Sequence, residues 1–233
     1  MIKLKEALTS SIGKKIINGL TAFGLVAFII VHLVGNLTLF AGADAFNAYA
    51  AKLHSLGVGL YVLEIGLVLV FLFHIGTGIS VTLENSSARS SDYRSGQKSK
   101  GGPSNFSFAS VRMIVSGLIL LMFLGIHLLQ FRLRPFISDN PDYSHEEYYK
   151  HLYTMVDNAF ADPVWVATYC LVMVFLGFHL RHGVWSMFQS IGAMNSRWKK
   201  SVYGVAFIVG LLLAIGFFVL PLSMYFDWAP IGG

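Results

Sequence analysis

Cysteine and charged residues are scarce in this sequence. The chain of 233 residues contains one cysteine, Cys170, so it cannot by itself hold an iron–sulfur cluster or a zinc–thiolate site, which need several thiolates. It can also form no internal disulfide. Charged residues make up 12% of the chain, about half of their usual share in soluble domains. With 55% hydrophobic residues and a mean hydropathy of +0.63, this composition excludes an ordinary soluble globular protein.

Long apolar stretches are abundant, and five of them meet the length of roughly 20 residues that a membrane-crossing helix needs. They predict an all-α integral membrane protein, one domain over residues 1–233, with five transmembrane helices in an up-down bundle. The predicted helices span residues 16–40, 56–83, 111–131, 163–189 and 202–225. Residues 84–110 would form a cytoplasmic loop and residues 132–162 an outer interfacial segment. The first stretch is about twice as long as the apolar region of a signal peptide, so we expect it to be retained.

The charges are distributed unevenly between the two sides of the predicted bundle. Lysine and arginine favour the cytoplasmic side of a membrane, and most acidic residues fall on the other side. We therefore expect a cytoplasmic N-terminus and an outer C-terminus in the cell's inner membrane. The net charge of +5 then reflects orientation and gives no indication of nucleic-acid binding. The basic residues on the cytoplasmic side are Lys3, Lys5, Lys14, Lys15, Arg89, Arg94, Lys98, Lys100, Arg112, Arg197, Lys199 and Lys200.

Two local signals predict helix starts on the outer side. The run Ser144 to Glu147 has the spacing of a capping box and would open a short interfacial helix that continues through Ala159. Asp162 followed by Pro163 combines an N-cap residue with a proline in the first turn. The second signal places the start of the fourth membrane helix at residue 163.

Histidine is the unusual residue of this apolar chain, which contains eight. Four of the five predicted helices carry histidine within their apolar cores, where ionisable residues are rare and commonly functional. A neutral imidazole there needs a partner for its nitrogen atoms, and haem iron is one that histidine readily ligates. The intramembrane histidines are His32, His74, His127, His179 and His182.

Depth sorts four of these histidines into two levels. At 1.5 Å per residue, His32 lies about 25 Å from the cytoplasmic start of its helix, and His127 lies five residues before Arg132 at the outer end of its own. His74 and His179 each lie about 13–15 Å from the cytoplasmic ends of theirs. The sequence therefore offers an outer pair, His32 with His127, and an inner pair, His74 with His179. This pattern predicts two bis-histidine haems b, stacked across the membrane.

Glycines accompany the inner pair. Gly78 and Gly183 each follow a histidine by four residues, so each lies on the same helix face as that histidine and leaves room for a flat macrocycle. Small residues also pack helices together in membranes, and a lone histidine there can simply hydrogen-bond a neighbouring helix. Four histidines matched in depth favour haem. His182, three residues after His179, is an alternative ligand or a partner for a haem propionate.

Three runs resemble a known family: SSIGKK at Ser10–Lys15, HLVGNL at His32–Leu37 and HLRHGVWS at His179–Ser186. They are similar to the di-haem cytochrome b subunit of succinate dehydrogenase and fumarate reductase complexes. The likeness covers nearly the whole chain, including the helix count and one histidine on each of the first four helices. In this family the ligands pair as the depth argument pairs them, and Gly183 with Trp185 matches the family motif around His179.

The resemblance implies a membrane anchor and electron-transfer subunit. Its partners would be a flavoprotein subunit and an iron–sulfur subunit on the cytoplasmic side, and its electron partner a membrane quinone, often menaquinone in single-chain di-haem members. The chain would then belong to an enzyme without itself carrying the dehydrogenase chemistry. One departure is Gly177, where some quinol-oxidising members have a glutamate proposed to conduct protons.

Several charged residues are candidates for parts of this chemistry. Arg181, Lys14, Lys15 and Arg112 are candidate cations for the haem propionates, although all four also suit anchoring at the interface. Glu64 lies in the outer half of its predicted helix, ten residues before His74. A carboxylate at that depth is costly, so Glu64 is a candidate for protonating a quinone, with a hydrogen bond to a neighbouring helix as the alternative.

Two other classes of protein compete with this interpretation. One is another five-helix di-haem quinone cytochrome, such as the membrane subunit of a nitrate reductase or a hydrogenase. Those families place paired histidines on one helix, whereas this chain spreads them over four. The other is a haem-free membrane transport or assembly protein with polar residues along a pathway.

Overall fold

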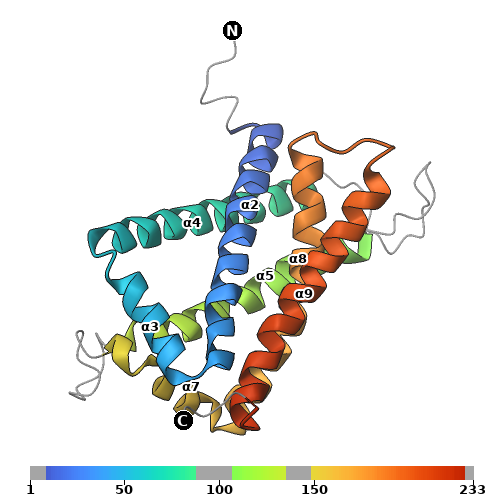
Figure 1. Cartoon of the computed structure of the whole chain (residues 1–233). Helices are drawn as coiled ribbons and strands as arrows, with labels where there is room; N and C mark the ends of the chain where they lie inside the picture. Colours follow the sequence, from blue (N-terminus) through green and yellow to red (C-terminus); the bar gives the residue numbers. More distant parts are fainter. Residues whose placement is uncertain (1–8, 88–106, 135–147, 229–233) are drawn as a thin grey trace.

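The computed structural model describes residues 9–87, 107–134 and 148–228 (Figure 1). These residues form helices joined by short turns, with no strand among them. The all-helical prediction is therefore confirmed for the described chain. The predicted capping box at residues 144–147 and most of the predicted loop at 84–110 lie outside the described residues.

Five long helices dominate the structure, and each is long and apolar enough to cross a membrane. The prediction of a multi-pass membrane protein is thus supported. The first helix begins at Ser11 rather than at residue 16 because the Ser10 hydroxyl accepts a hydrogen bond from Gly13 N at 3.0 Å and caps it. The five helices are α2 (Ser11–Asn36), α4 (Val58–Ser87), α5 (Ser107–His127), α8 (Pro163–Ser190) and α9 (Lys199–Tyr225).

The start of α8 follows the predicted signal. Asp162 is the N-cap, and its carboxylate accepts a hydrogen bond from Val164 N at 2.8 Å. Pro163 occupies the first turn, where its missing N–H leaves no hydrogen bond unmade.

Short helices cover one end of the long ones. A short helix before α8 was expected, and α7 ends at Phe160. The 12-residue α3 was not expected, because it is short and of mixed polarity; it begins after Gly42, whose positive φ of 94° turns the chain. A single-turn π-helix, η3, continues α5 after His127. These elements are η1 (Leu37–Ala41), α3 (Ala43–His54), η3 (Leu128–Arg132), η5 (Tyr148–Lys150) and α7 (Leu152–Phe160).

Helix α8 is central to the packing, in contact with α9, α2 and α5, while α2 also contacts α4. In Figure 1, α9 runs along α8 and α4 crosses α2 steeply. Glycine lets α8 and α9 approach closely: a Cβ on Gly210 would lie 3.0 Å from the backbone oxygen of Gly177 and 3.0 Å from the backbone nitrogen of Arg181. Small residues at helix contacts are typical of membrane proteins.

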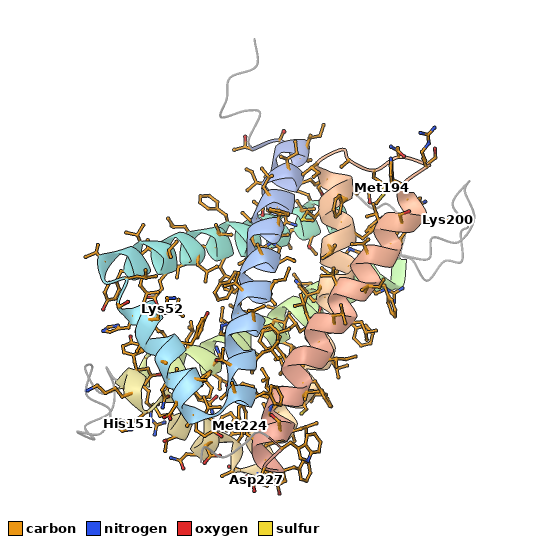
Figure 2. The ribbon with its side chains drawn as sticks, in the orientation of Figure 1. Lys52, His151, Met194, Lys200, Met224 and Asp227 are labelled. Atoms are coloured by element: carbon orange, nitrogen blue, oxygen red, sulfur yellow. The ribbon has the colours of Figure 1, made fainter. Side chains whose placement is uncertain are left out.

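The best-packed core lies at the end of the molecule where α2 and α9 terminate, close to α7 (Figure 1). There Tyr153 N donates to Asn47 Oδ1 at 2.9 Å and ties α7 to α3. Elsewhere many large apolar side chains are exposed, as expected for surfaces that face lipid. In Figure 2, Met194 and Lys200 lie at one end of the α8–α9 pair, and Met224 and Asp227 lie at the opposite end.

Candidate functional site

Four intramembrane histidines meet in two pairs. The imidazole centroids of His32 on α2 and His127 on α5 are 5.9 Å apart, with an angle of 85° between the ring planes. The centroids of His74 on α4 and His179 on α8 are 6.4 Å apart, at 74°. The structure thus brings together the two pairs that depth in the sequence predicts, each joining two different helices.

The separations suit one metal ion between each pair of rings. A metal–nitrogen bond of about 2 Å on each side, together with the radius of the two imidazoles, puts the centroids of two axial ligands about 6 Å apart. A haem needs only these two protein ligands. Each pair supplies two imidazoles from different helices, which is the number of protein ligands that a bis-histidine haem takes.

Hydrogen bonds select the tautomer of His179. Its Nδ1 lies 3.1 Å from the hydroxyl of the buried Ser116, on α5. The same hydroxyl lies 3.1 Å from Met113 O, and with its proton on that carbonyl it accepts from His179 Nδ1–H. Nε2 is then left with its lone pair, the form that ligates a metal.

The same arrangement occurs at the outer pair. His127 Nδ1 lies 3.3 Å from the hydroxyl of Tyr169 on α8. This hydroxyl donates to Gln130 Oε1 at 2.7 Å, and with its proton there it accepts from His127 Nδ1–H, which leaves the lone pair on His127 Nε2. Each histidine pair therefore has one member held by a hydroxyl whose own proton is already engaged.

The other two members are held differently. The side-chain amide of Asn36 lies 3.5 Å from His32 Nε2 and donates to His32 O at 2.8 Å. The ring of His74 interacts with the backbone of Asn18 on α2, and its Nδ1 makes no hydrogen bond of standard geometry among the described residues.

Aromatic rings and glycines border the two pairs. Phe28 stacks on His32 with centroids 5.4 Å apart, and Phe123 stacks on His127 at 5.7 Å. A Cβ on Gly183 would meet nothing within 4 Å, which leaves open space beside it. Gly78 is more confined, since its Cβ would lie 3.7 Å from Asn18 Oδ1.

His182 lies one turn further along α8. Its ring is 5.7 Å from that of Trp185, which stacks on Tyr203 of α9 at 5.0 Å. His182 Nδ1 is buried with no hydrogen-bond partner in the part of the chain that the structure describes. The structure pairs His179, and not His182, with His74.

Two of the candidate propionate cations, Lys14 and Arg181, have contacts that the structure describes. Lys14 forms an ion pair with Glu84, which also accepts from the Ser11 hydroxyl at 3.0 Å, so α2 is tied to α4 at this end. Lys15 is exposed, and the side chain of Arg112 lies outside the described set. Arg181 lies two residues after His179, on a different face of α8, with its guanidinium 5.5 Å from the ring of Phe207.

Glu64 forms a bidentate ion pair. Arg132 Nε donates to Glu64 Oε1 at 2.7 Å, and Nη2 donates to Oε2 at 2.9 Å. This contact joins α4 to η3, the π-turn that directly follows His127. The structure therefore shows the interhelical contact that was the alternative to quinone chemistry, and π-turns are frequent at functional sites.

Tyr148 and Tyr149 interact electrostatically with Arg132 of this ion pair. Tyr149 stacks on His54 with centroids 4.0 Å apart, and burial raises its pKa. Tyr148 is buried, which also raises the pKa of its phenol. Both phenols therefore stay protonated at neutral pH, and Tyr148 Oη has no hydrogen-bond partner among the described residues.

Sequence reasoning missed Ser116 and Tyr169, which contact histidines, Gln130, which contacts Tyr169, and Arg132, which pairs with Glu64. Ser116 lies on an apolar helix with no spacing to connect it to His179, 63 residues further on. Arg132 was expected at the end of its predicted helix, and no partner was predicted for it. The one signal for it was Glu64, a carboxylate within an apolar helix that needs a cation.

Comparisons of this chain with protein-family models, with curated proteins and with solved structures find no match.

Proposed function

We propose that this chain is the membrane-anchor and electron-transfer subunit of a succinate:quinone oxidoreductase. It would bind two haems b, the outer one through His32 and His127 and the inner one through His74 and His179. The observation that carries the proposal is the pairing itself: four histidines from four helices meet two by two at ligand spacing. The resemblance of the HLVGNL and HLRHGVWS runs selects this family among quinone cytochromes.

Haem, when bound, supplies one-electron transfer across the membrane. The chain's own part is to ligate it, bury it and hold the ligands in one orientation. Ser116 and Tyr169 fix the Nδ1–H tautomers of His179 and His127, and a ligand histidine that donates in this way binds its metal more strongly. The aromatic rings of Phe28 and Phe123 keep the imidazoles in apolar surroundings.

Orientation and partners follow from the charges. The start of α2 and the turn between α8 and α9 both carry lysines and lie at the same end of the molecule (Figure 1). We infer that this end faces the cytoplasm at the cytoplasmic membrane and that it receives the iron–sulfur and flavoprotein subunits. Electrons would pass between the clusters of the iron–sulfur subunit and a membrane quinone, and we expect this quinone to be menaquinone.

Affinity purification of the tagged chain from solubilised membranes tests this assignment. It should recover a flavoprotein and an iron–sulfur protein together with succinate-oxidising or fumarate-reducing activity. A haem-bearing chain recovered with partners of the nitrate reductase or hydrogenase type would favour the competing di-haem class. A chain without haem would favour transport or assembly.

The tautomer-fixing hydroxyls should tune the two haems separately. Tyr169→Phe removes the acceptor for His127 Nδ1–H, which lowers the basicity of that ligand and favours the reduced iron. Losing one hydrogen bond of about 0.5–1.5 kcal/mol raises the midpoint potential of the outer haem by about 20–60 mV. Ser116→Ala should do the same to the inner haem. Redox titration of both variants measures this, and a shift of the same haem in both would contradict the assignments.

The Glu64–Arg132 pair with Tyr148 and Tyr149 is the candidate quinone site next to the outer haem. The protonated phenols can donate to quinone oxygens, and Glu64 can exchange a proton when Arg132 releases it. Glu64→Gln should lower quinone turnover about a hundredfold or more, the lower end of the range for loss of an acid–base group, while both haem spectra stay intact.

The other ion-paired carboxylate of α4 supplies the control. Glu84→Gln breaks the contact with Lys14 at the opposite end of the same helix and should leave turnover unchanged. If Glu64→Gln also left turnover per haem unchanged, Glu64 would have only the structural role of joining α4 to η3.

A further inference from the structure

An apolar groove lies between α8 and α9, with a single charged residue in its wall. Its volume is about 340 Å³. The floor is formed where Gly177 meets Ala214: a Cβ on Gly177 would lie 2.9 Å from that of Ala214, so no side chain can fill the space. The walls include Met173, Val174, Phe178, Arg181, Leu211 and Phe218.

Arg181 is the charge in this groove. Its side chain is exposed, and its guanidinium lies 5.5 Å from the centroid of the Phe207 ring. Neither of the two ion pairs found among the described residues involves Arg181. It lies nine residues before Ser190, about 13 Å along the helix from that end. A guanidinium at such a depth needs a negative partner or access to the interface.

The groove has the direction and length of one lipid leaflet. It extends along α8 from Arg181 back to Met173, a rise of about 12 Å, away from the end formed by the α8–α9 turn. Half of the hydrocarbon core of a bilayer is about 15 Å thick. Because Arg181 lies about 13 Å from the Ser190 end, a headgroup at that end would reach it through the snorkelling of its long side chain, and an acyl chain in the groove would extend past the middle of the membrane.

We propose that this groove binds an anionic phospholipid, with the headgroup phosphate on Arg181 and one acyl chain between α8 and α9. Arginine recognises phosphate through paired hydrogen bonds, and basic pockets between transmembrane helices are known to bind anionic headgroups. The rest of the groove lining is apolar, so it suits the hydrocarbon tail of a lipid and offers no partner for a second charged group. The site faces away from the histidine pairs and is independent of the proposed haem function.

Lipid binding to the purified full-length chain tests the proposal. Native mass spectrometry measures binding of dioleoyl phosphatidylglycerol, of dioleoyl phosphatidylcholine and of glycerol phosphate, which is an anion without tails. The wild-type chain should bind phosphatidylglycerol about five- to tenfold more tightly than phosphatidylcholine, the effect of about one charge contact, and glycerol phosphate weakly.

The variants separate the headgroup from the tail. Arg181→Gln should weaken binding of phosphatidylglycerol about five- to tenfold, and Arg181→Lys should retain most of it. Val174→Trp, which fills the groove, should weaken it with Arg181 intact. Arg197→Gln, an exposed arginine in the turn after α8, is the matched control and should change binding less than about twofold.

Several outcomes would overturn the proposal. Equal phosphatidylglycerol binding by the Arg181→Gln and wild-type chains would show that Arg181 does not contact the headgroup. Unchanged binding by Val174→Trp, or glycerol phosphate binding as tight as the lipid, would remove the acyl-chain site. A dimer of the wild-type chain that Val174→Trp converts to a monomer would instead make the groove an interface between copies. Helix content by circular dichroism checks that each variant is folded.

Discussion

Alanine in place of His32 or His127 should remove one and the same haem, and alanine in place of His74 or His179 should remove the other. The reason is that each iron would be held by two imidazoles from different helices, at centroid separations of 5.9 and 6.4 Å. Loss of either axial ligand opens the site and leaves one bond to the protein. Haem content by pyridine haemochrome assay, with the spectrum of the haem that remains, measures the result. We expect a fall from two haems per chain to one in every single variant.

Two further histidines serve as controls. His151→Ala changes an exposed residue at the end of the molecule (Figure 2) and should keep both haems. His182→Ala decides between the two histidines of α8, and retention of both haems is expected because the structure pairs His179 with His74. Loss of different haems from His32→Ala and His127→Ala would refute the pairing.

Leucine in place of Gly210 should destabilise the fold by separating α8 from α9. A Cβ at this position would already lie 3.0 Å from backbone atoms of Gly177 and Arg181, and backbone atoms cannot move aside as a side chain can. Overpacking of this kind costs about 1–3 kcal/mol or more. Thermal unfolding in detergent, followed by circular dichroism, should show a clearly lower midpoint for the Gly210→Leu chain.

Gly204→Leu is the matched control, because it makes the same change on the same helix. A Cβ on Gly204 meets nothing within 4 Å, so the unfolding midpoint should stay near that of the wild-type chain. Equal destabilisation by both variants would mean that the loss comes from the glycine itself rather than from contact between α8 and α9.

The long helices were predictable because membrane burial imposes a simple pattern. The apolar stretches marked all five, and Asp162 with Pro163 fixed the start of α8. Helix α3 was missed because its 12 residues carry no apolar run, and its start depends on the positive φ of Gly42. Contacts across the chain, such as Asn47 with Tyr153, have no local signature.

The histidine pairs were predictable for a different reason: helix rise converts position in the sequence into depth. The same calculation could not find Ser116 or Tyr169, because hydroxyls are common in membrane helices and their partners depend on how the helices pack. The depth calculation also does not predict toward which neighbouring helix a side chain points. Arg181 is at a suitable depth for the inner haem, but the structure turns it toward Phe207 on α9.

Charge partners were the least predictable part of the site. From its position in the sequence Lys14 was a candidate partner for a haem propionate, and in the structure it forms an ion pair with Glu84. Glu64 and Arg132 are 68 residues apart in sequence, so neither revealed the other. Both carboxylates of α4 prove to be held by cations, as expected for charges close to lipid.

The most direct test of the central claim is the haem content of the purified wild-type chain, together with a reduced-minus-oxidised spectrum. The account predicts about two haems b per chain, seen as a b-type difference spectrum with two midpoint potentials in a redox titration. A correctly folded chain with no b-type signal, or with a single haem, would contradict it.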